Sequence, residues 1–147
     1  MSKKVLIIDD DENIVKYLSV ALSKGGYEVV GAYDGKEGLE KVGEFGPDLI
    51  VLDIMMPKKT GLVVFRQLRG NDDYKDIPII MLTSIADVID EQAAVADEHP
   101  EYEGLREVLG RAIRQMRDDG LEKPELFVDK PVDPHELVEN VRALIGD

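Results

Sequence analysis

The sequence contains no cysteine and only two histidines, His99 and His135, in 147 residues. The lack of cysteine excludes a disulfide framework, a thiol nucleophile and a thiolate zinc site, and it fits a reducing compartment. With two histidines, histidine-based metal chemistry is not expected. The longest hydrophobic runs have four residues, whereas a membrane-spanning helix needs about 20. The chain turns acidic at Asp9, where a signal peptide would stay apolar, so we expect a soluble, cytoplasmic protein without a membrane segment.

Positive charge is scarce in this sequence. Its 18 lysines and arginines stand against 31 aspartates and glutamates, which gives a formal net charge of -13. A surface of this charge repels a phosphate backbone, so direct binding of nucleic acid is not expected. The length fits one domain spanning residues 1–147, because domains usually have roughly 100 to 200 residues. Little room is left for a tethered output domain.

Three uninterrupted apolar tetrads, Val5–Ile8, Leu49–Leu52 and Ile79–Leu82, are typical of strands buried on both faces of a parallel sheet. Two shorter segments, Tyr27–Val30 and Leu126–Val128, predict two further strands. Because helical segments separate these strands, the pattern predicts an α/β fold with a doubly wound parallel sheet and helices on both faces.

Four helical segments have apolar residues at helical spacing. The first is expected to turn one stripe inward, made of Ile14, Tyr17, Leu18, Ala21 and Leu22. Lys36–Glu44 predicts a weak helix because it holds two glycines, and Gly61–Arg69 predicts a third helix. The last helix has Asp133 as its N-cap and Pro134 as its first residue. Its predicted inward residues are Leu137, Val138, Val141, Leu144 and Ile145.

The segment between the fourth and fifth strands is longer than one crossover needs. From Thr83 to Lys130 the chain takes 47 steps, where a single helix with its loops needs roughly 20 to 25. We therefore expect an insertion at approximately residues 90–120 that adds an extra helix. The expected helices run from Asp87 to about Asp97 and from Glu101 to about Asp118.

Polar residues stand at the carboxyl ends of the predicted strands, where ligands collect in doubly wound sheets. They are Asp9, Asp10, Asp53, Thr83, Ser84 and Lys130. If the strand order is 2-1-3-4-5, the three aspartates converge and repel one another strongly. Mg²⁺ fits such oxygen ligands better than Ca²⁺, and the lysine supplies a second positive charge.

These residue types favour phosphoryl chemistry. An ionised aspartate beside Mg²⁺ and a lysine is a workable nucleophile toward a phosphoryl group, and the product is an aspartyl phosphate. Thr83 would then donate its hydroxyl to one phosphoryl oxygen, and Lys130 would pair with another.

Four motifs in this order resemble the receiver domains of two-component response regulators. The motifs are Val5-Leu6-Ile7-Ile8-Asp9-Asp10, Leu52-Asp53-Ile54-Met55-Met56-Pro57 with Gly61, Thr83-Ser84, and Lys130-Pro131. The resemblance covers nearly the whole chain outside residues 90–120. It implies a flavodoxin-like five-stranded sheet in the order 2-1-3-4-5.

The resemblance also implies a role for each site residue. Asp53 would accept a phosphoryl group from a phosphohistidine of a histidine kinase or a histidine phosphotransfer protein. Mg²⁺ would be held by Asp9, Asp10 and Asp53, with the backbone carbonyl of Met55 as a further ligand. The chain would be no enzyme toward external substrates, since it would catalyse only its own phosphorylation and dephosphorylation.

The same resemblance implies which residues and which surface would transmit the signal. Thr83 and Phe127 would be the switch residues, and Lys130–Pro131 would be joined by a cis peptide bond. The fourth helix, fifth strand and fifth helix would form the face that meets a downstream protein. The insertion falls on that face, where it would set the choice of partner or act only as a stabilising lid.

This chain departs from the family at several positions. Many receivers have tyrosine at the position of Phe127, and the segment Leu121–Glu125 replaces a cluster of small and acidic residues. Met55 and Ile85 are apolar at positions that influence how water reaches the phosphoryl group in this family, so we predict slow self-dephosphorylation.

Two other functions stay open at this point. A pseudo-receiver scaffold would bind partners without phosphate, although the complete set of site residues argues against it. An aspartyl-phosphate phosphatase would use similar carboxylates and magnesium. That class has a second aspartate two residues after the nucleophile, and this chain has Met55 there.

Overall fold

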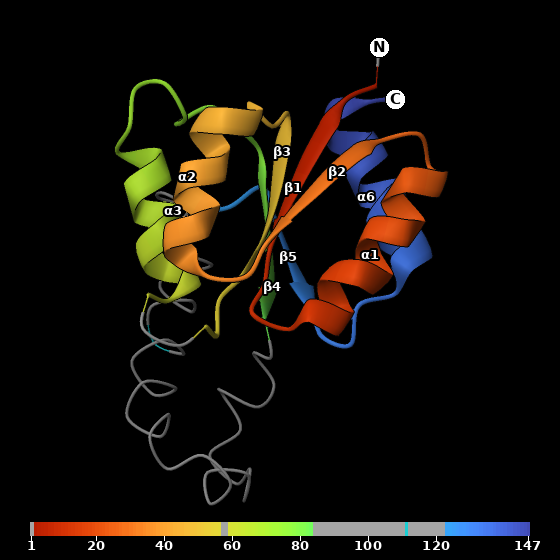
Figure 1. Cartoon of the computed structure of the whole chain (residues 1–147), viewed down its shortest axis with the longest axis horizontal. Helices are drawn as coiled ribbons and strands as arrows, with labels where there is room; N and C mark the ends of the chain where they lie inside the picture. The colour runs from red at the N-terminus through yellow and green to blue at the C-terminus, as the bar shows by residue number, and fades with distance from the viewer. Residues whose placement is uncertain (1, 57–58, 84–110, 112–122) are drawn as a thin grey trace, which may run out of the picture. The chain divides into compact units, whose positions relative to one another are not determined.

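Figure 1 presents the computed structural model of the chain, which describes residues 2–56, 59–83, 111 and 123–147. The contacts divide the chain into two compact units, Met1–Thr83 with Pro124–Asp147, and Ser84–Lys123. All helices and strands given below belong to the first unit. The two helices predicted for the insertion lie outside the described residues, apart from Arg111, which is helical.

The first unit is built on a parallel sheet of five strands. They are β1 (Lys4–Ile8), β2 (Glu28–Ala32), β3 (Leu49–Asp53), β4 (Ile79–Thr83) and β5 (Leu126–Asp129). The strands lie in the order β2-β1-β3-β4-β5, and every neighbouring pair is parallel. The predicted flavodoxin-like topology is therefore confirmed.

Four described helices cover the two faces of this sheet. They are α1 (Glu12–Lys24), α2 (Gly35–Phe45), α3 (Gly61–Arg69) and α6 (Pro134–Ile145). Figure 1 shows α1 and α6 on one face and α2 and α3 on the other. Each helix begins after a side chain that accepts its first free N–H groups, namely Asp11, Asp34, Thr60 and Asp133. Such caps account for the observed starts of the helices.

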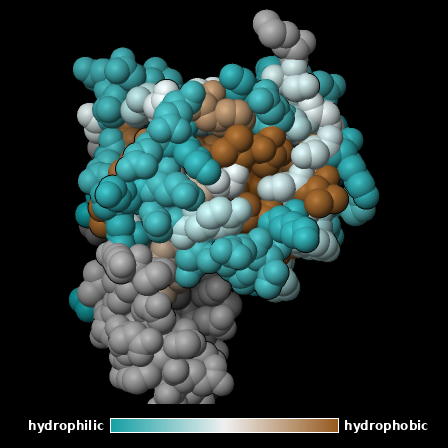
Figure 2. Space-filling view, in the orientation of Figure 1, coloured by the Kyte–Doolittle hydropathy of each residue, from teal (hydrophilic) through white to brown (hydrophobic). Residues whose placement is uncertain are grey.

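The core consists of the three central strands and the inner faces of the helices. All residues of β3 and β4 are buried, as are Val5–Ile8 of β1. Alternate strand residues pack against α1 and α6, including Val5, Val51 and Leu82. The outer strand β2 is only half-buried over most of its length, and Figure 2 shows hydrophobic side chains on the surface where this strand lies.

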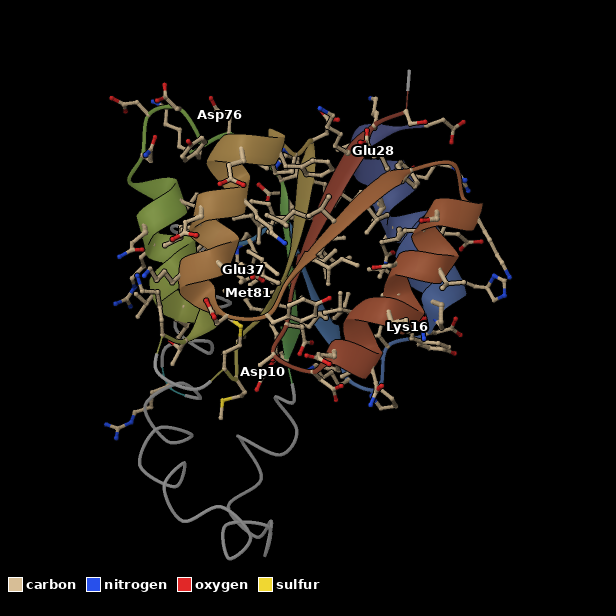
Figure 3. All side chains as sticks on the ribbon, in the orientation of Figure 1. Asp10, Lys16, Glu28, Glu37, Asp76 and Met81 are labelled. Atoms are coloured by element: carbon tan, nitrogen blue, oxygen red, sulfur yellow. The ribbon has the colours of Figure 1, made fainter. Side chains whose placement is uncertain are left out.

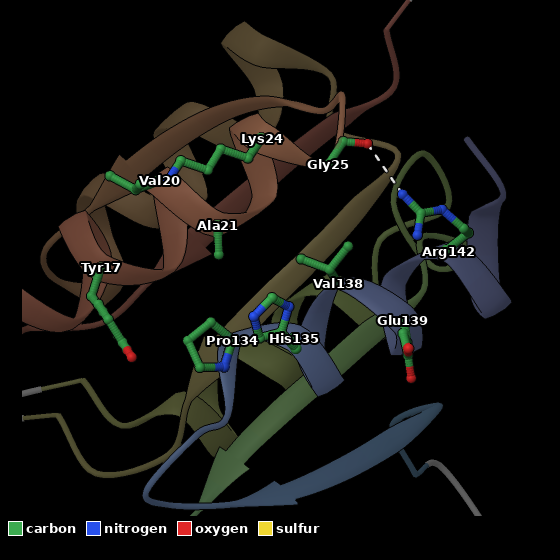
Figure 4. A pocket seen from close by; sticks show the side chains of 10 residues that line it. All are labelled: Tyr17, Val20, Ala21, Lys24, Gly25, Pro134, His135, Val138, Glu139 and Arg142. Atoms are coloured by element: carbon green, nitrogen blue, oxygen red, sulfur yellow. Dashed lines mark hydrogen bonds between the residues drawn. The ribbon is translucent and has the colours of Figure 1, made fainter.

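Two residues predicted to point inward are exposed, and those predictions are wrong. Tyr17 is 61% exposed and Leu144 is 37% exposed, whereas Val15 in α1 is buried. The buried stripe of α1 is narrower than predicted and consists of Val15, Leu18 and Leu22. Tyr17 instead lines a groove of about 490 Å³ between α1 and α6, shown in Figure 4. Among the described helices, none is long and apolar enough to cross a membrane.

Helix α2 approaches β1 closely because one of its residues has no side chain. A Cβ atom on Gly38 would lie 2.7–3.0 Å from the side chain of Ile8, which is fully buried. Gly43 in the same helix is exposed, and a Cβ there would meet only the Tyr74 hydroxyl, at 3.1 Å. A side chain at position 43 therefore has room, whereas a side chain at position 38 would clash with Ile8.

We expect Gly38→Ala to lower the free energy of unfolding by about 1–2 kcal/mol, because overpacking against Ile8 outweighs the gain in helix propensity. Gly43→Ala is the matched control and should raise it by up to about 1 kcal/mol, since the Tyr74 hydroxyl can move away. Urea unfolding followed by circular dichroism measures both changes. Equal effects of the two substitutions would contradict the close approach of α2.

Candidate functional site

The candidate site lies at the carboxyl edge of the sheet. Asp9 follows the end of β1, while Asp53 and Thr83 are the last residues of β3 and β4. Figure 3 shows Asp10 at this edge, opposite the edge where Glu28 begins β2. Because β1 lies beside β3, the aspartates of the two strands become neighbours. This is the reversal point of the strand order, where ligands bind in such folds.

Three carboxylates gather at this point. Asp9, Asp10 and Asp53 each offer an oxygen atom, and these atoms lie within 4.8 Å of one another. Asp9 is fully buried and Asp53 is 2% exposed, whereas Asp10 faces the solvent. The structure therefore brings together the three aspartates predicted from the sequence.

The side chain of Lys130 bridges the two buried carboxylates. Its Nζ lies 3.2 Å from Oδ2 of Asp9 and 3.2 Å from Oδ1 of Asp53. The backbone N–H of Lys130 donates to the carbonyl of Thr83 at 2.9 Å, which ties the end of β5 to β4. The Lys130–Pro131 peptide bond is cis, as the sequence analysis expects.

The backbone around Asp53 is held by a close contact with α3. The N–H of Gly61 donates to the carbonyl of Ile54 at 2.9 Å. A Cβ atom on Gly61 would lie 2.1 Å from the backbone oxygen of Asp53. Glycine is therefore required at this position if Asp53 is to keep its place, a role that the sequence motif alone does not explain.

Burial and charge shift the pKa values of the site. Burial and, to a lesser extent, repulsion from Asp9 raise the pKa of Asp53 to about 7, and the nearby Lys130 ammonium limits the increase. The pKa of Asp10 is also raised, by partial desolvation of its carboxyl group and by repulsion from Asp9. Burial alone would lower the pKa of Lys130, but attraction to Asp53 and Asp9 outweighs this effect and raises it. An added cation would favour the ionised form of Asp53.

The predicted switch residues lie on β4, which pairs with the strand of Asp53, and on β5, the next strand of the sheet. Thr83 is 1% exposed, and its hydroxyl oxygen has no hydrogen-bond partner in the described part of the chain. Phe127 is half-buried in β5 and lies opposite Met81 in the ladder. Ser84, Pro57 and Ile85 lie outside the described residues.

The donor set fits a hard divalent cation. Three carboxylate oxygens within 4.8 Å of one another supply the ligand type that Mg²⁺ prefers. Half-buried Met55 follows Asp53 by two residues, and its carbonyl as a further ligand stays a prediction. The site therefore combines a carboxylate that an added cation would ionise, a fixed ammonium and an unpartnered hydroxyl.

Known proteins with the same sequence pattern are response regulators. The family model of the response regulator receiver domain matches residues 5–102. The response regulators MprA of Mycobacterium sp. (strain KMS) and Mycobacterium ulcerans (strain Agy99) are 38% identical over 143 residues and 39% identical over 145 residues. Each alignment covers 91% of this chain but 61% or 62% of the relative, so the chain spans less than two thirds of their length.

Solved structures with a similar fold include the chemotaxis response regulator CheY4 of Vibrio cholerae. It is 28% identical, with a TM-score of 0.69, over 98% of this chain and 99% of that one. A response regulator receiver domain protein from Clostridium thermocellum is 25% identical, with a TM-score of 0.71, over 97% of this chain and 94% of that one. Together with the family model, these similarities show that the chain belongs to the response regulator receiver domains of two-component systems.

Proposed function

We propose that this chain is a phosphoacceptor receiver that takes a phosphoryl group onto Asp53 and signals through protein contacts. The observation that carries the proposal is the bridging lysine, whose Nζ lies 3.2 Å from Asp53 inside a cluster of three carboxylates. A structural ion pair would need only one carboxylate. The additional acidic groups cost electrostatic energy, which a bound cation would offset.

In the proposed reaction, a carboxylate oxygen of Asp53 attacks the phosphorus atom of a phosphohistidine. The new O–P bond forms as the N–P bond breaks, and the electron pair of that bond stays on the imidazole nitrogen. Asp9, Asp10 and Asp53 would hold Mg²⁺, which supplies positive charge that offsets the repulsion between carboxylate and phosphoryl group. Lys130 would pair with one phosphoryl oxygen, and the buried hydroxyl of Thr83 would donate to another.

The proposed partners follow from the family. A histidine kinase or a histidine phosphotransfer protein would supply the phosphoryl group, and a downstream protein would read the state of Thr83 and Phe127. Because the chain spans less than two thirds of its MprA relatives, their partners and output are not carried over. We propose that the described face beside β5 and α6 contributes to the downstream contact.

Phosphorylation of Asp53 can be tested with a small phosphoryl donor and Mg²⁺, followed by mass spectrometry of the peptides. We expect label on Asp53 in the wild type, no label in Asp53→Asn, and labelling about 10²-fold slower in Lys130→Ala because a fixed cation is lost. Asp129→Asn is a matched control, since Asp129 is exposed beside Lys130. An unlabelled wild type would favour the pseudo-receiver, and turnover of an external phosphomonoester would favour the phosphatase.

The raised pKa of Asp53 predicts how pH changes stability without metal. A carboxyl whose pKa rises from 3.8 to about 7 on folding binds its proton more tightly in the folded state. Its contribution to the free energy of unfolding therefore falls as pH rises through this range. We expect Asp53→Asn to be more stable than wild type at pH ~8, by on the order of a few kcal/mol, and to differ little near pH ~4.

Urea unfolding across this pH range measures the difference between the two proteins. Mg²⁺ should stabilise the wild type more at high pH than at low pH, because protons compete for the same oxygens. Asp72→Asn is the charge-matched control, since the Asp72 side chain is 98% exposed. A parallel pH dependence of wild type and Asp53→Asn would contradict the raised pKa.

The lifetime of the phosphoryl group depends on access of water. Half-buried Met55 is apolar and cannot orient a water molecule for attack. We expect slow self-dephosphorylation in the wild type and loss of phosphate about tenfold faster in Met55→Asn, which adds polar groups at the same position. Release of phosphate from labelled protein gives both rates. A wild-type half-life of seconds would contradict this prediction.

A further inference from the structure

The strand that precedes Lys130 is the least buried strand on its side of the sheet. Among the described strands, β5 is an outer strand that pairs with β4 alone, through four residue pairs from Leu126 to Asp129. None of its four residues is fully buried, whereas all five residues of β4 are. Packing therefore fixes the register of β5 less firmly than that of the central strands.

A second interaction holds the beginning of β5. The backbone N–H of Glu125, the residue before the strand, donates to the carbonyl of Ile79 at 3.0 Å. In return, Oε2 of Glu125 accepts the N–H of Ile79 at 2.6 Å. The same carboxylate pairs with Arg69, whose Nη2 lies 2.9 Å from Oε1 and 2.8 Å from Oε2. Glu125 thus joins the start of β5 to the start of β4 and to α3.

Arg69 is a rigid anchor for this carboxylate. Its side chain is only 12% exposed, and its Nη1 donates to the carbonyls of Lys75 at 3.0 Å and Ile77 at 2.8 Å. Its guanidinium lies 5.0 Å from the centre of the Phe65 ring, and Phe65 is buried. Because these contacts hold the guanidinium in place, a carboxylate that pairs with it is positioned as well.

We infer that the Arg69–Glu125 pair is a positioning element that sets the register of β5 and thereby places the Lys130 ammonium beside Asp53. A slip of one residue would move the strand by about 3.3 Å and turn its side chains to the opposite face. The contacts of Lys130 with Asp9 and Asp53, each 3.2 Å, do not survive such a slip. The pair lies at the opposite end of β5 from Lys130, so it acts through the strand.

This inference rests on the proposed function only for its effect on phosphorylation. Glu125→Ala should slow labelling of Asp53 by a small donor by roughly tenfold at saturating Mg²⁺, as displaced catalytic groups do. The Mg²⁺ concentration for half-maximal labelling should stay within about twofold, because the acidic residues lie on other elements. Glu125→Gln keeps one oxygen for the N–H of Ile79 but loses the two-oxygen ion pair with Arg69, so it should restore only part of the rate. Asp72→Asn controls for loss of an acidic charge.

Hydrogen exchange gives a readout that does not depend on phosphorylation. In Glu125→Ala, the Lys130 amide, which bonds to the Thr83 carbonyl, should exchange at least about tenfold faster, while amides of β1 and β3 keep their protection. Faster exchange at every strand would mean global destabilisation and would overturn the inference. Unchanged exchange at Lys130 would overturn it too, whether or not Asp53 is labelled.

Discussion

Repulsion between carboxylates at the ends of β1 and β3 is the constraint on which the rest of the site depends. The parallel pairing of the two strands forces Asp9 and Asp53 together, and both are nearly inaccessible to water. Only Lys130, 3.2 Å from each, offsets this charge among the described residues. Two buried acids with one base leave a deficit of positive charge, which a cation held by these carboxylates would offset.

Much of the fold could be predicted because the buried strands carry a strong signal. The uninterrupted tetrads form four of the five residues in each of β1, β3 and β4, and their burial on both faces explains why they are apolar throughout. The edge strand β2 ends at Ala32, two residues beyond the predicted end at Val30. The prediction stops short because Gly31 and Ala32 have no clear strand pattern. The helical spacing of Tyr17 with Ile14 and Ala21 predicts that its side chain points inward, but it lies at the margin of the stripe and is exposed. Burial at such a margin depends on the neighbouring elements, which spacing does not reveal.

The sequence predicts which residues form the candidate site, but it does not predict the distances between their side chains. Polar residues at four strand ends are visible in the sequence, and the order of the strands brings them together. The bridging position of Lys130 depends on the register of β5, for which the sequence holds no periodic signal. Glu125 and Arg69 are 56 residues apart, and Glu125 lies in a segment that departs from the family pattern, so the sequence gives no sign of their contact. Gly61 was visible as part of a motif, but its closeness to the Asp53 backbone needs coordinates.

The distribution of burial also explains why β5 is the part of the sheet suited to respond to a change at Asp53. Close-packed β1, β3 and β4 resist displacement, because each would lose contacts on both faces. β5 has one neighbour, half-exposed side chains and a lysine bound to the group that would change. If Lys130 exchanges a carboxylate partner for a phosphoryl oxygen, the end of β5 near Thr83 can adjust while the Arg69–Glu125 pair holds its beginning. In the proposed switch, a strand anchored at its beginning and displaced at its end would convert a change in charge into a change in surface shape.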